Sequence, residues 1–552
     1  MAIGLSGFLI RSAFSPSAKF ATACRVAVWA DNVGVPFIEL SMHNNNDNLF
    51  AALRAGFPAD LDATAIECAD AEGLSYSWRD LERGTAMLAN LLESLDLPAG
   101  SRVAVQTEKS VEALMLYLAV LRAGLVYLPL NTAYLAAEIE YFIGNAEPAV
   151  VVCAPRCFGW VSKLAFKCGT RHVFTLGEDR SGTLLDRASQ MSDQHVVAQR
   201  APGDMAAILY TSGTTGRSKG AMLSHGNLLS NALTLKQQWA WQPDDVLIHS
   251  LPIFHVHGLF VASHGALLNG SKMIWFSKFD PRAVISRLPD ATVFMGVPTL
   301  YVRMLGEGAL DKSACRKVRL FISGSAPMLL ETFRDWQSRT GHTILERYGM
   351  SETVMLTSNP YRPESARKGG TVGPALPGVG LRVLDDSAKP CGVDEIGNIE
   401  VRGPNVFAGY WRMPEKTAEE FTADGWFKTG DVGRVDAEGY VTIVGRSKDL
   451  IITGGYNVYP AEIEAYVNDM SGVAETAVIG VPHPDFGEAV VAVVVPKAGT
   501  QLDASAIIGS LKSQIANFKV PKKVFIEAEL PRNAMGKVQK KLLRDAHAGL
   551  FV

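Results

Sequence analysis

Short runs of β-branched residues alternate with amphipathic stretches along much of this 552-residue chain, and this rhythm constrains the fold most strongly. "RVAVQ" (102–106) predicts a strand, "SVEALMLYLAVLRAG" (110–124) a helix and "LVYLPL" (125–130) a second strand, together a βαβ unit. Strands that alternate with helices form parallel sheets covered by helices, so we expect an α/β architecture. Further strand candidates are "AVVVCA", "DVLIHSLP", "MIWF", "ATVFMGVP" and "RLFISG".

The pattern changes after about residue 370, where hairpin signals replace the alternation. "GVGLRVLDD", "GNIEVRG" and "GWFKTGDVGRVDAEGYVTIVG" contain Gly and Asp turns, which predicts a small, mostly antiparallel subdomain. "GRSKDLIITGGYNVYP" (445–460) is the best candidate for a domain boundary. Beyond it we expect a compact α+β unit with helices at "PAEIEAYVNDM" and "ASAIIGSLKSQIANF" and strands at "ETAVIGVP", "AVVAVVVP" and "KVFIE".

The first 41 residues differ from the rest of the chain. They contain Arg11, Lys19 and Arg25 with several Ser and no acid in the first 30 positions. Two interpretations fit: an organellar transit peptide, which implies a mitochondrial location, or an upstream start ahead of a native start at Met42, which implies a cytoplasmic one. We favour the second, and under both interpretations residues 1–41 lie outside the fold.

Size and charge exclude several classes of protein. A chain of this length needs more than one core. The net charge of −3 and the pI near 6.4 provide no broad basic field for nucleic acid or anionic lipid. No apolar stretch reaches the roughly 18 to 20 residues of a membrane helix. The seven cysteines are an odd number, thinly spread, which favours reduced thiols.

The loop "YTSGTTGRSKG" (210–220) is rich in Gly, Ser and Thr and carries two cations. Small residues allow backbone N–H groups to approach an anion, so the composition indicates a polyphosphate site, with a polar surface turn as the alternative. It is not a Walker A loop, because Gly213 and Gly216 are three apart and Lys219 precedes Gly220.

Four further motifs follow this loop in order: "RYGMSET" (347–353), "TGD" (429–431), "GRSKD" (445–449) and "PRNAMGK" (531–537). From about Leu49 onward the chain therefore resembles the acyl-adenylate-forming, or AMP-binding, enzymes. Within that superfamily, "QTEKSVEALMLYLAVLRAGLVYLPLNTAY", "LFISGSAP" and "LERYGMSET" resemble the malonyl-CoA synthetases. The resemblance implies an N-terminal AMP- and acyl-binding domain (42–447) and a mobile C-terminal domain (448–552).

The resemblance also implies which residues bind ATP and Mg²⁺. Glu352 would hold Mg²⁺, Asp431 and Arg446 would contact ribose or phosphate, and Tyr348 would lie against adenine. Ser351 stands where the family normally has Thr. The other implied nucleotide-binding residues are Thr211, Ser212, Gly213, Thr214, Thr215 and Lys219 at the phosphates, and Gly324, Ser325, Ala326, Gly349 and Met350 around the base.

Lys537 is the residue on which the implied mechanism depends. By similarity it bridges the carboxylate and the α-phosphate in the first half-reaction, and acetylation by a lysine acetyltransferase would remove its charge. Lys448, at the family's hinge position, would let the small domain rotate, so that Gly454 and Gly455 face coenzyme A. The implied catalytic residues are Lys537, Glu352, Thr211 and His255.

The implied acyl pocket decides the substrate. "LPIFHVHGLF" and "GVPTLYVRML" line it by similarity, with His255 and His257, and with Arg303 and Arg319 as candidate cations. We predict Arg319 as the anchor for the distal carboxylate of malonate; the alternative is an orienting or ion-paired arginine. We assign His255 to the gate towards the coenzyme A tunnel, with a hydrogen-bonded core histidine as the alternative.

The expected reaction is the ATP- and Mg²⁺-dependent ligation of malonate to coenzyme A through an acyl-adenylate. Methylmalonate is a second expected substrate, because one methyl group changes discrimination by only about 1–3 kcal/mol. A ligase for another short-chain or aromatic acid is the alternative.

Overall fold

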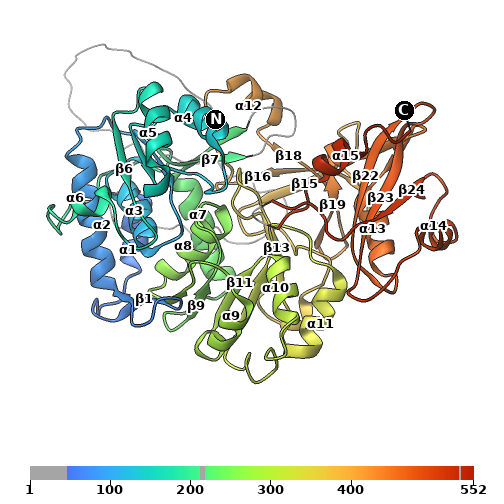
Figure 1. Cartoon of the computed structure of the whole chain (residues 1–552), viewed down its shortest axis with the longest axis horizontal. Helices are drawn as coiled ribbons and strands as arrows, with labels where there is room; N and C mark the ends of the chain where they lie inside the picture. Colours follow the sequence, from blue (N-terminus) through green and yellow to red (C-terminus); the bar gives the residue numbers. More distant parts are fainter. Residues whose placement is uncertain (1–45, 212–217, 534–535, 552) are drawn as a thin grey trace, which may run out of the picture. The chain divides into compact units, whose positions relative to one another are not determined.

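The computed structural model describes residues 46–211, 218–533 and 536–551; the predicted extension 1–41 lies outside them. Its largest sheet has eight strands, and the six inner strands run parallel with an antiparallel strand at each edge. The order is β14 (Thr357–Ser358), β13 (Leu345–Tyr348), β12 (Leu320–Ser323), β11 (Val293–Gly296), β9 (Val246–His249), β10 (Lys272–Trp275), β1 (Thr64–Cys68) and β2 (Ser75–Ser77) (Figure 1).

A second sheet of seven strands contains the predicted βαβ unit. Helix α3 (Val111–Arg122) connects its parallel strands β3 (Arg102–Gln106) and β4 (Val126–Pro129), which confirms that prediction. Every residue of α3 is buried, which explains why the helix has no polar face. The other strands are β17 (Gly409–Tyr410), β8 (Lys219–Ser224), β7 (Met205–Thr211), β5 (Val150–Cys153) and β6 (His172–Thr175).

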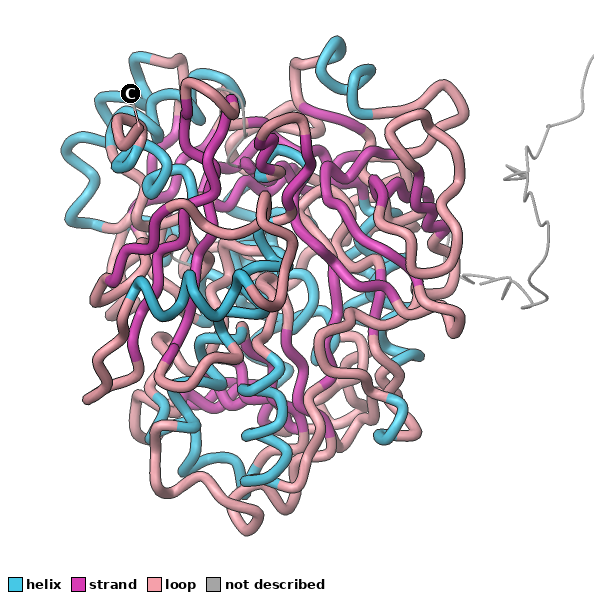
Figure 2. The backbone as a smooth tube through the Cα atoms, turned by 90° about the vertical axis from the view of Figure 1, so that its right-hand side faces the viewer, coloured by secondary structure: helices cyan, strands magenta, loops and turns pink. Residues whose placement is uncertain are grey.

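Helices lie between and around these strands, as Figure 2 shows. None of the helices in the described part of the chain is long and apolar enough to cross a membrane. They are α1 (Leu49–Ala55), α2 (Trp78–Glu93), α4 (Ala136–Ala146), α5 (Phe158–Lys167), α6 (Thr183–Ala188), α7 (His225–Gln238), a π-helix η2 (His257–Ala262), α8 (Ser263–Leu267), α9 (Pro281–Arg287), α10 (Pro298–Leu305), α11 (Leu330–Thr340) and α12 (Pro414–Glu420).

The predicted antiparallel subdomain is a four-stranded sheet of β15 (Gly380–Leu384), β16 (Gly397–Arg402), β18 (Phe427–Val435) and β19 (Val441–Arg446). A five-stranded sheet with its own apolar clusters follows. It contains β20 (Ile451–Thr453), β21 (Tyr456–Val458), β22 (Val473–His483), β23 (Gly487–Pro496), β24 (Lys523–Ile526) and the helices α13 (Pro460–Asn468), α14 (Ala504–Lys512) and α15 (Lys540–His547). The sequence did not predict α15, and α14 ends at Lys512, six residues before the predicted end.

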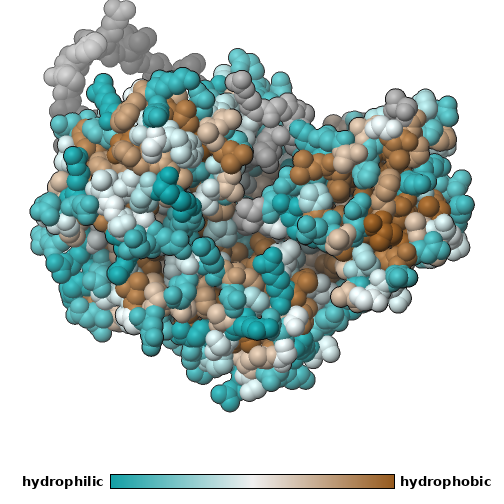
Figure 3. Space-filling view, in the orientation of Figure 1, coloured by the Kyte–Doolittle hydropathy of each residue, from teal (hydrophilic) through white to brown (hydrophobic). Residues whose placement is uncertain are grey.

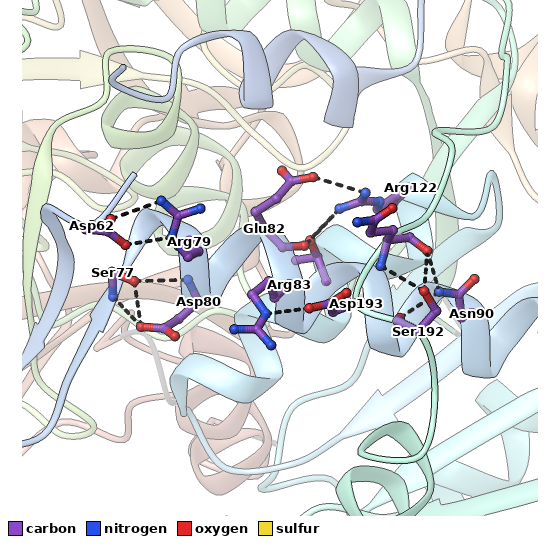
Figure 4. Close-up of polar contacts among 12 residues, drawn as sticks. Asp62, Ser77, Arg79, Asp80, Glu82, Arg83, Asn90, Arg122, Ser192 and Asp193 are labelled. Atoms are coloured by element: carbon purple, nitrogen blue, oxygen red, sulfur yellow. Dashed lines mark hydrogen bonds and ion pairs between the residues drawn. The ribbon is translucent and has the colours of Figure 1, made fainter. Parts of the chain in front are cut away.

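Arg122 at the end of α3 connects three segments of the first domain (Figure 4). Its guanidinium donates to the carbonyl oxygen of Glu82 at 3.0 Å and to that of His195 at 2.6 Å, and it pairs with the Glu82 carboxylate at 3.1 Å. The side chain is only 4% exposed. The neighbouring pair of Arg83 and Asp193 is instead open to solvent.

We therefore expect Arg122→Met to lower the apparent free energy of unfolding by about 3 kcal/mol, because the buried carbonyl acceptors lose their donor and the Glu82 carboxylate is left with Arg54. Arg83→Met is the matched control, and its exposed ion pair contributes at most about 1 kcal/mol. Urea denaturation followed by circular dichroism measures both values. Equal losses in the two variants would contradict this assignment.

Candidate active site

Because β9, β12 and β13 are parallel, their carboxyl ends all lie at the same end of the eight-stranded sheet. The segment with His255 and His257 follows β9, Gly324 to Ala326 follow β12, and Tyr348 ends β13. Three motifs that are distant in the sequence therefore converge. In open α/β sheets this end is where ligands bind.

The backbone after β12 has a conformation that ordinary residues avoid. Ser325 has a φ of 72°, in the left-handed region, and its hydroxyl lies 3.4 Å from Nδ1 of His257. A Cβ atom at Gly324 would lie 2.4 Å from Nη1 of Arg347. Glycine is therefore needed at position 324 to admit the arginine, and the strained turn is typical of a functional site.

Tyr348, Asp431 and Arg446 form a connected group. The Tyr348 hydroxyl donates to Oδ2 of Asp431, and Nε of Arg446 lies 2.9 Å from Oδ1. Asp431 and Arg446 face each other across β18 and β19, and the Asp431 carboxylate is buried. Two acceptor oxygens beside an aromatic ring match what a ribose diol and a base need, so the predicted roles remain consistent with the geometry.

Glu352 is a buried carboxylate whose Oε1 accepts a hydrogen bond of 3.0 Å from the Tyr410 hydroxyl. Burial raises the pKa of Glu352. Lys219 lies over the ring of the same tyrosine, 4.2 Å from its centroid, and pairs with Glu420 at 3.1 Å. Among the described residues no group of three metal-binding side chains occurs. Mg²⁺ nevertheless often binds to a single protein carboxylate when the phosphates of a substrate supply further oxygen ligands. Glu352 therefore fits the expected ion.

Thr211 and Lys219 face each other at the ends of β7 and β8, with the Thr211 hydroxyl 3.4 Å from the Lys219 carbonyl oxygen. The glycine-rich loop therefore connects the end of β7 to the start of β8. The predicted residues Ser212, Gly213, Thr214 and Thr215 lie outside the described residues.

The loop before Lys537 approaches α10. Gly536 has a φ of 72°, and a Cβ atom there would lie 2.7 Å from Oγ1 of Thr299. The Lys537 backbone N–H donates to Oδ1 of Asn533 at 3.0 Å. Although Lys537 keeps exposed surface, burial of its ammonium group lowers its pKa to about 8, and the Arg446 charge acts in the same direction. The structure therefore brings Lys537 to the predicted nucleotide-binding residues.

The predicted hinge residue lies between the last two sheets, and the predicted coenzyme A residues lie in a hairpin of the last sheet. Lys448 is exposed in a short 3-10 turn (Ser447–Asp449) between β19 and β20. Gly454 and Gly455 form the two-residue turn between β20 and β21, with φ values of 56° and 80°. Positive φ at both positions is the reason for a Gly-Gly pair in this hairpin. Their roles in rotation and coenzyme A binding stay predictions.

The prediction of Arg319 as the carboxylate anchor is wrong. Its Nε donates to Oδ1 of the buried Asp245 at 2.7 Å, Nη2 pairs with Oδ2, and Nη1 donates to the Trp239 carbonyl oxygen at 3.1 Å. Arg319 precedes β12, whereas Gly324 follows it, so the two lie about 16 Å apart along the strand. Arg319 is therefore an ion-paired arginine at the amino ends of the strands, opposite the end where Gly324 lies.

Arg347 is the buried cation that sequence analysis missed. It lies on β13 directly before Tyr348, is 2% exposed, and its Nε and Nη2 have no hydrogen-bond partner among the described residues. Burial lowers the pKa of Arg347 to about 9. Arg303 is instead exposed on α10. The signal for Arg347 was its place within "RYGMSET", but no sequence pattern shows whether such a cation has an acidic partner.

Both predicted histidines lie beside Arg347. Burial lowers the pKa of His255 to about 4, and the charges of Arg347 and Lys537 add to the shift. His257 is completely buried, burial likewise lowers its pKa, and its Nε2 has no partner in the described part of the chain. Two neutral imidazoles thus lie close to the charge of Arg347. The gate assigned to His255 stays a prediction.

Comparison with known proteins agrees with this geometry. The model of the AMP-binding enzyme family matches residues 56–411, and that of its C-terminal domain matches residues 462–537. The chain belongs to the AMP-binding enzyme family. The resemblance inferred from the motifs and the predicted fold class are therefore confirmed.

Individual relatives and a solved structure give a more specific comparison than the family model. The chain is 33% identical to a malonate–CoA ligase of Arabidopsis thaliana over 91% of this chain and 89% of the relative. It is 32% identical to a mitochondrial malonate–CoA ligase of Bos taurus, over 94% of both. The crystal structure of ATP-bound MatB from Rhodopseudomonas palustris is 54% identical, superimposes with a TM-score of 0.89, and covers 92% of this chain and 100% of that one.

The lowered pKa of Lys537 predicts how adenylation depends on pH. If the charged ammonium is required, kcat/KM for adenylation should be constant below about pH 8 and fall about tenfold per pH unit above it, because the proton is lost as pH rises through the pKa. Pyrophosphate release at saturating ATP-Mg²⁺ and limiting acid measures the profile. Lys537→Arg should move any residual decline to higher pH, and an unchanged profile up to about pH 10 would contradict the assignment.

Proposed function

We propose that this chain ligates malonate to coenzyme A in an ATP-dependent reaction through malonyl-AMP. The observation that carries the proposal is Arg347, whose Nε and Nη2 are buried beside His255 and His257 and have no partner among the residues that the structure describes. These two nitrogens form one edge of a guanidinium, the edge that binds a carboxylate through two parallel hydrogen bonds. A fatty acid would leave this charge unpaired, whereas the distal carboxylate of malonate neutralises it.

In the first half-reaction, a malonate carboxylate oxygen attacks the α-phosphorus of ATP and pyrophosphate leaves. The carboxylate is already a nucleophile, so the chain needs no general base and instead has to offset repulsion between anions. Lys537 would place its charge between the carboxylate and the α-phosphate, while Arg446 and Asp431 hold the ribose side. Mg²⁺ on Glu352 would neutralise phosphate charge.

In the second half-reaction, the coenzyme A thiolate attacks the malonyl carbonyl carbon and AMP leaves. We propose that residues 448–552 rotate about Lys448 for this step, withdrawing Lys537 and presenting Gly454 and Gly455. Large apolar side chains of this domain are exposed, among them Ile452 at 52% and Tyr456 at 59% on the β20–β21 hairpin, and Figure 3 shows hydrophobic surface over the domain. An apolar hairpin face supports a second docking position.

Two further proposals concern the chain as a whole. Acetylation of Lys537 by a lysine acetyltransferase would stop the first half-reaction, since it removes the charge. We propose a cytoplasmic location, or a mitochondrial one if residues 1–41 act as a transit peptide, as the location of the relative from Bos taurus suggests.

Arg347→Met should lower kcat/KM for malonate about 100-fold, because two charge-assisted hydrogen bonds contribute about 3 kcal/mol and each 1.4 kcal/mol is tenfold. The value for propionate, which has a methyl group in place of the distal carboxylate, should stay the same or rise. AMP formation with each acid measures both. Arg319→Met is the control, expected to lower thermal stability and leave the malonate KM unchanged. A parallel loss with malonate and propionate would reject the carboxylate role of Arg347.

Lys537→Ala should abolish adenylation and spare thioester formation from supplied malonyl-AMP, because the ammonium acts only in the first half-reaction. Pyrophosphate release and malonyl-CoA formation report the two steps separately. Lys540→Ala, which removes a nearby lysine that pairs with Glu464 at 2.6 Å, is the control. Loss of both half-reactions in Lys537→Ala would rule out the two-position scheme.

A further inference from the structure

Lys109 is a second buried cation, distant from the motifs. It lies between β3 and α3, and no carboxylate of the described residues pairs with it. Its Nζ lies 2.8 Å from the carbonyl oxygen of His249, 2.7 Å from that of Phe276, and 3.0 Å from Nδ1 of His249. The ring of Trp275 lies 4.2 Å from the same nitrogen. Three acceptors and an aromatic face thus surround one amine.

The hydrogen-bond geometry determines how many protons Lys109 and His249 hold together. Two carbonyl oxygens accept from Nζ, and Nε2 of His249 donates to the Gly258 carbonyl oxygen at 3.0 Å, since carbonyls only accept. The contact between Nζ and Nδ1 needs one more hydrogen from either side. The contacts therefore need four N–H groups in total. A neutral amine has two and a neutral imidazole has one, so the pair must hold one additional proton. The pair therefore carries one positive charge.

The hydrogen bonds of His249 connect Lys109 to the segment that carries the predicted acyl-pocket histidines. Its Nε2 contacts the Gly258 carbonyl oxygen and the Ser263 hydroxyl at 3.1 Å, and that hydroxyl donates to the same carbonyl at 2.9 Å. Gly258 belongs to the π-helix η2, which begins at His257. A Cβ atom at Gly258 would lie 2.2 Å from the Pro252 carbonyl oxygen, so the helix packs tightly on the segment that carries His255. π-Helical turns frequently occur at functional sites.

We propose that Lys109 and His249 form a buried, singly protonated positioning pair that holds η2, and with it His255 and His257, in register with Arg347. Neither residue touches the substrate. The pair acts because its bonds fix the carbonyl of Gly258, and misplacement of a binding group by about 1 Å costs up to about 100-fold in rate. The inference rests on the proposed function, since it assigns these histidines to the malonate pocket.

Lys109→Met keeps the length of the side chain and removes the charge and the donors. It should raise the malonate KM about tenfold or more and leave the ATP KM within about twofold, because the nucleotide residues lie on other segments. Lys163→Met, at an exposed position of α5, is the matched control and should change neither value. A malonate KM equal to that of the unaltered protein would overturn the proposal, even if the thermal midpoint falls.

A second pair of variants separates hydrogen bonding from packing. Gln at position 249 offers an acceptor to Lys109 and a donor to Gly258, whereas Leu offers neither. His249→Gln should therefore retain the malonate KM within about threefold, and His249→Leu should resemble Lys109→Met. Equal malonate KM values in the two folded variants would contradict a hydrogen-bonding role.

Nuclear magnetic resonance of protein with ¹⁵N-labelled histidine provides a readout that does not depend on activity. The His249 ring should show a protonated Nε2, and its Nδ1 signal should shift in Lys109→Met while the Lys163→Met spectrum stays unchanged. An unshifted Nδ1 would overturn the pair itself. If the unaltered protein forms no malonyl-CoA while the Nδ1 signal responds as expected, the proposed function fails and the pair stands.

Discussion

The site depends on the common direction of β9, β12 and β13. Because these strands are parallel, the segments that follow them all emerge at one edge, which brings His255, Ser325 and Tyr348 together. Side chains that precede the same strands emerge at the other edge, where Arg319 binds Asp245. Strand polarity therefore decides which polar residues belong to the site and which stabilise the domain.

The second constraint is the energetic cost of buried positive charge. Arg347 is 2% exposed, and its Nε and Nη2 have no partner in the described part of the chain. Lys109 has carbonyl and imidazole partners in place of a carboxylate. Desolvating an unpaired cation costs several kcal/mol, so such groups are rare unless a ligand or a dense set of acceptors offsets the penalty. A ligand can offset the penalty at Arg347, whereas a dense set of acceptors offsets it at Lys109. The charge of Lys109 is thus already satisfied by the protein, which distinguishes it from Arg347.

The ordered motifs and the βαβ pattern predicted the main architecture correctly, since hydrophobic periodicity reports strands and helices directly. The helix from Val111 to Arg122 and the strands on both sides of it lie within two residues of their predicted ends. The end of α14 was predicted six residues too late, because the apolar pattern continues past the last helical turn at Lys512.

The sequence by itself determined the family and the α/β architecture, because motif order and local composition are properties of the chain. The residues that it assigns to the nucleotide stay predictions. Only the tertiary structure shows which arginine is buried close to His255 and His257. Arg319 directly precedes a short buried strand and Arg347 lies within another. Only the fold shows that Arg319 pairs with Asp245, while Nε and Nη2 of Arg347 have no partner among the described residues. The role of a charge depends on its partners in space, and those partners come from segments far away in the sequence.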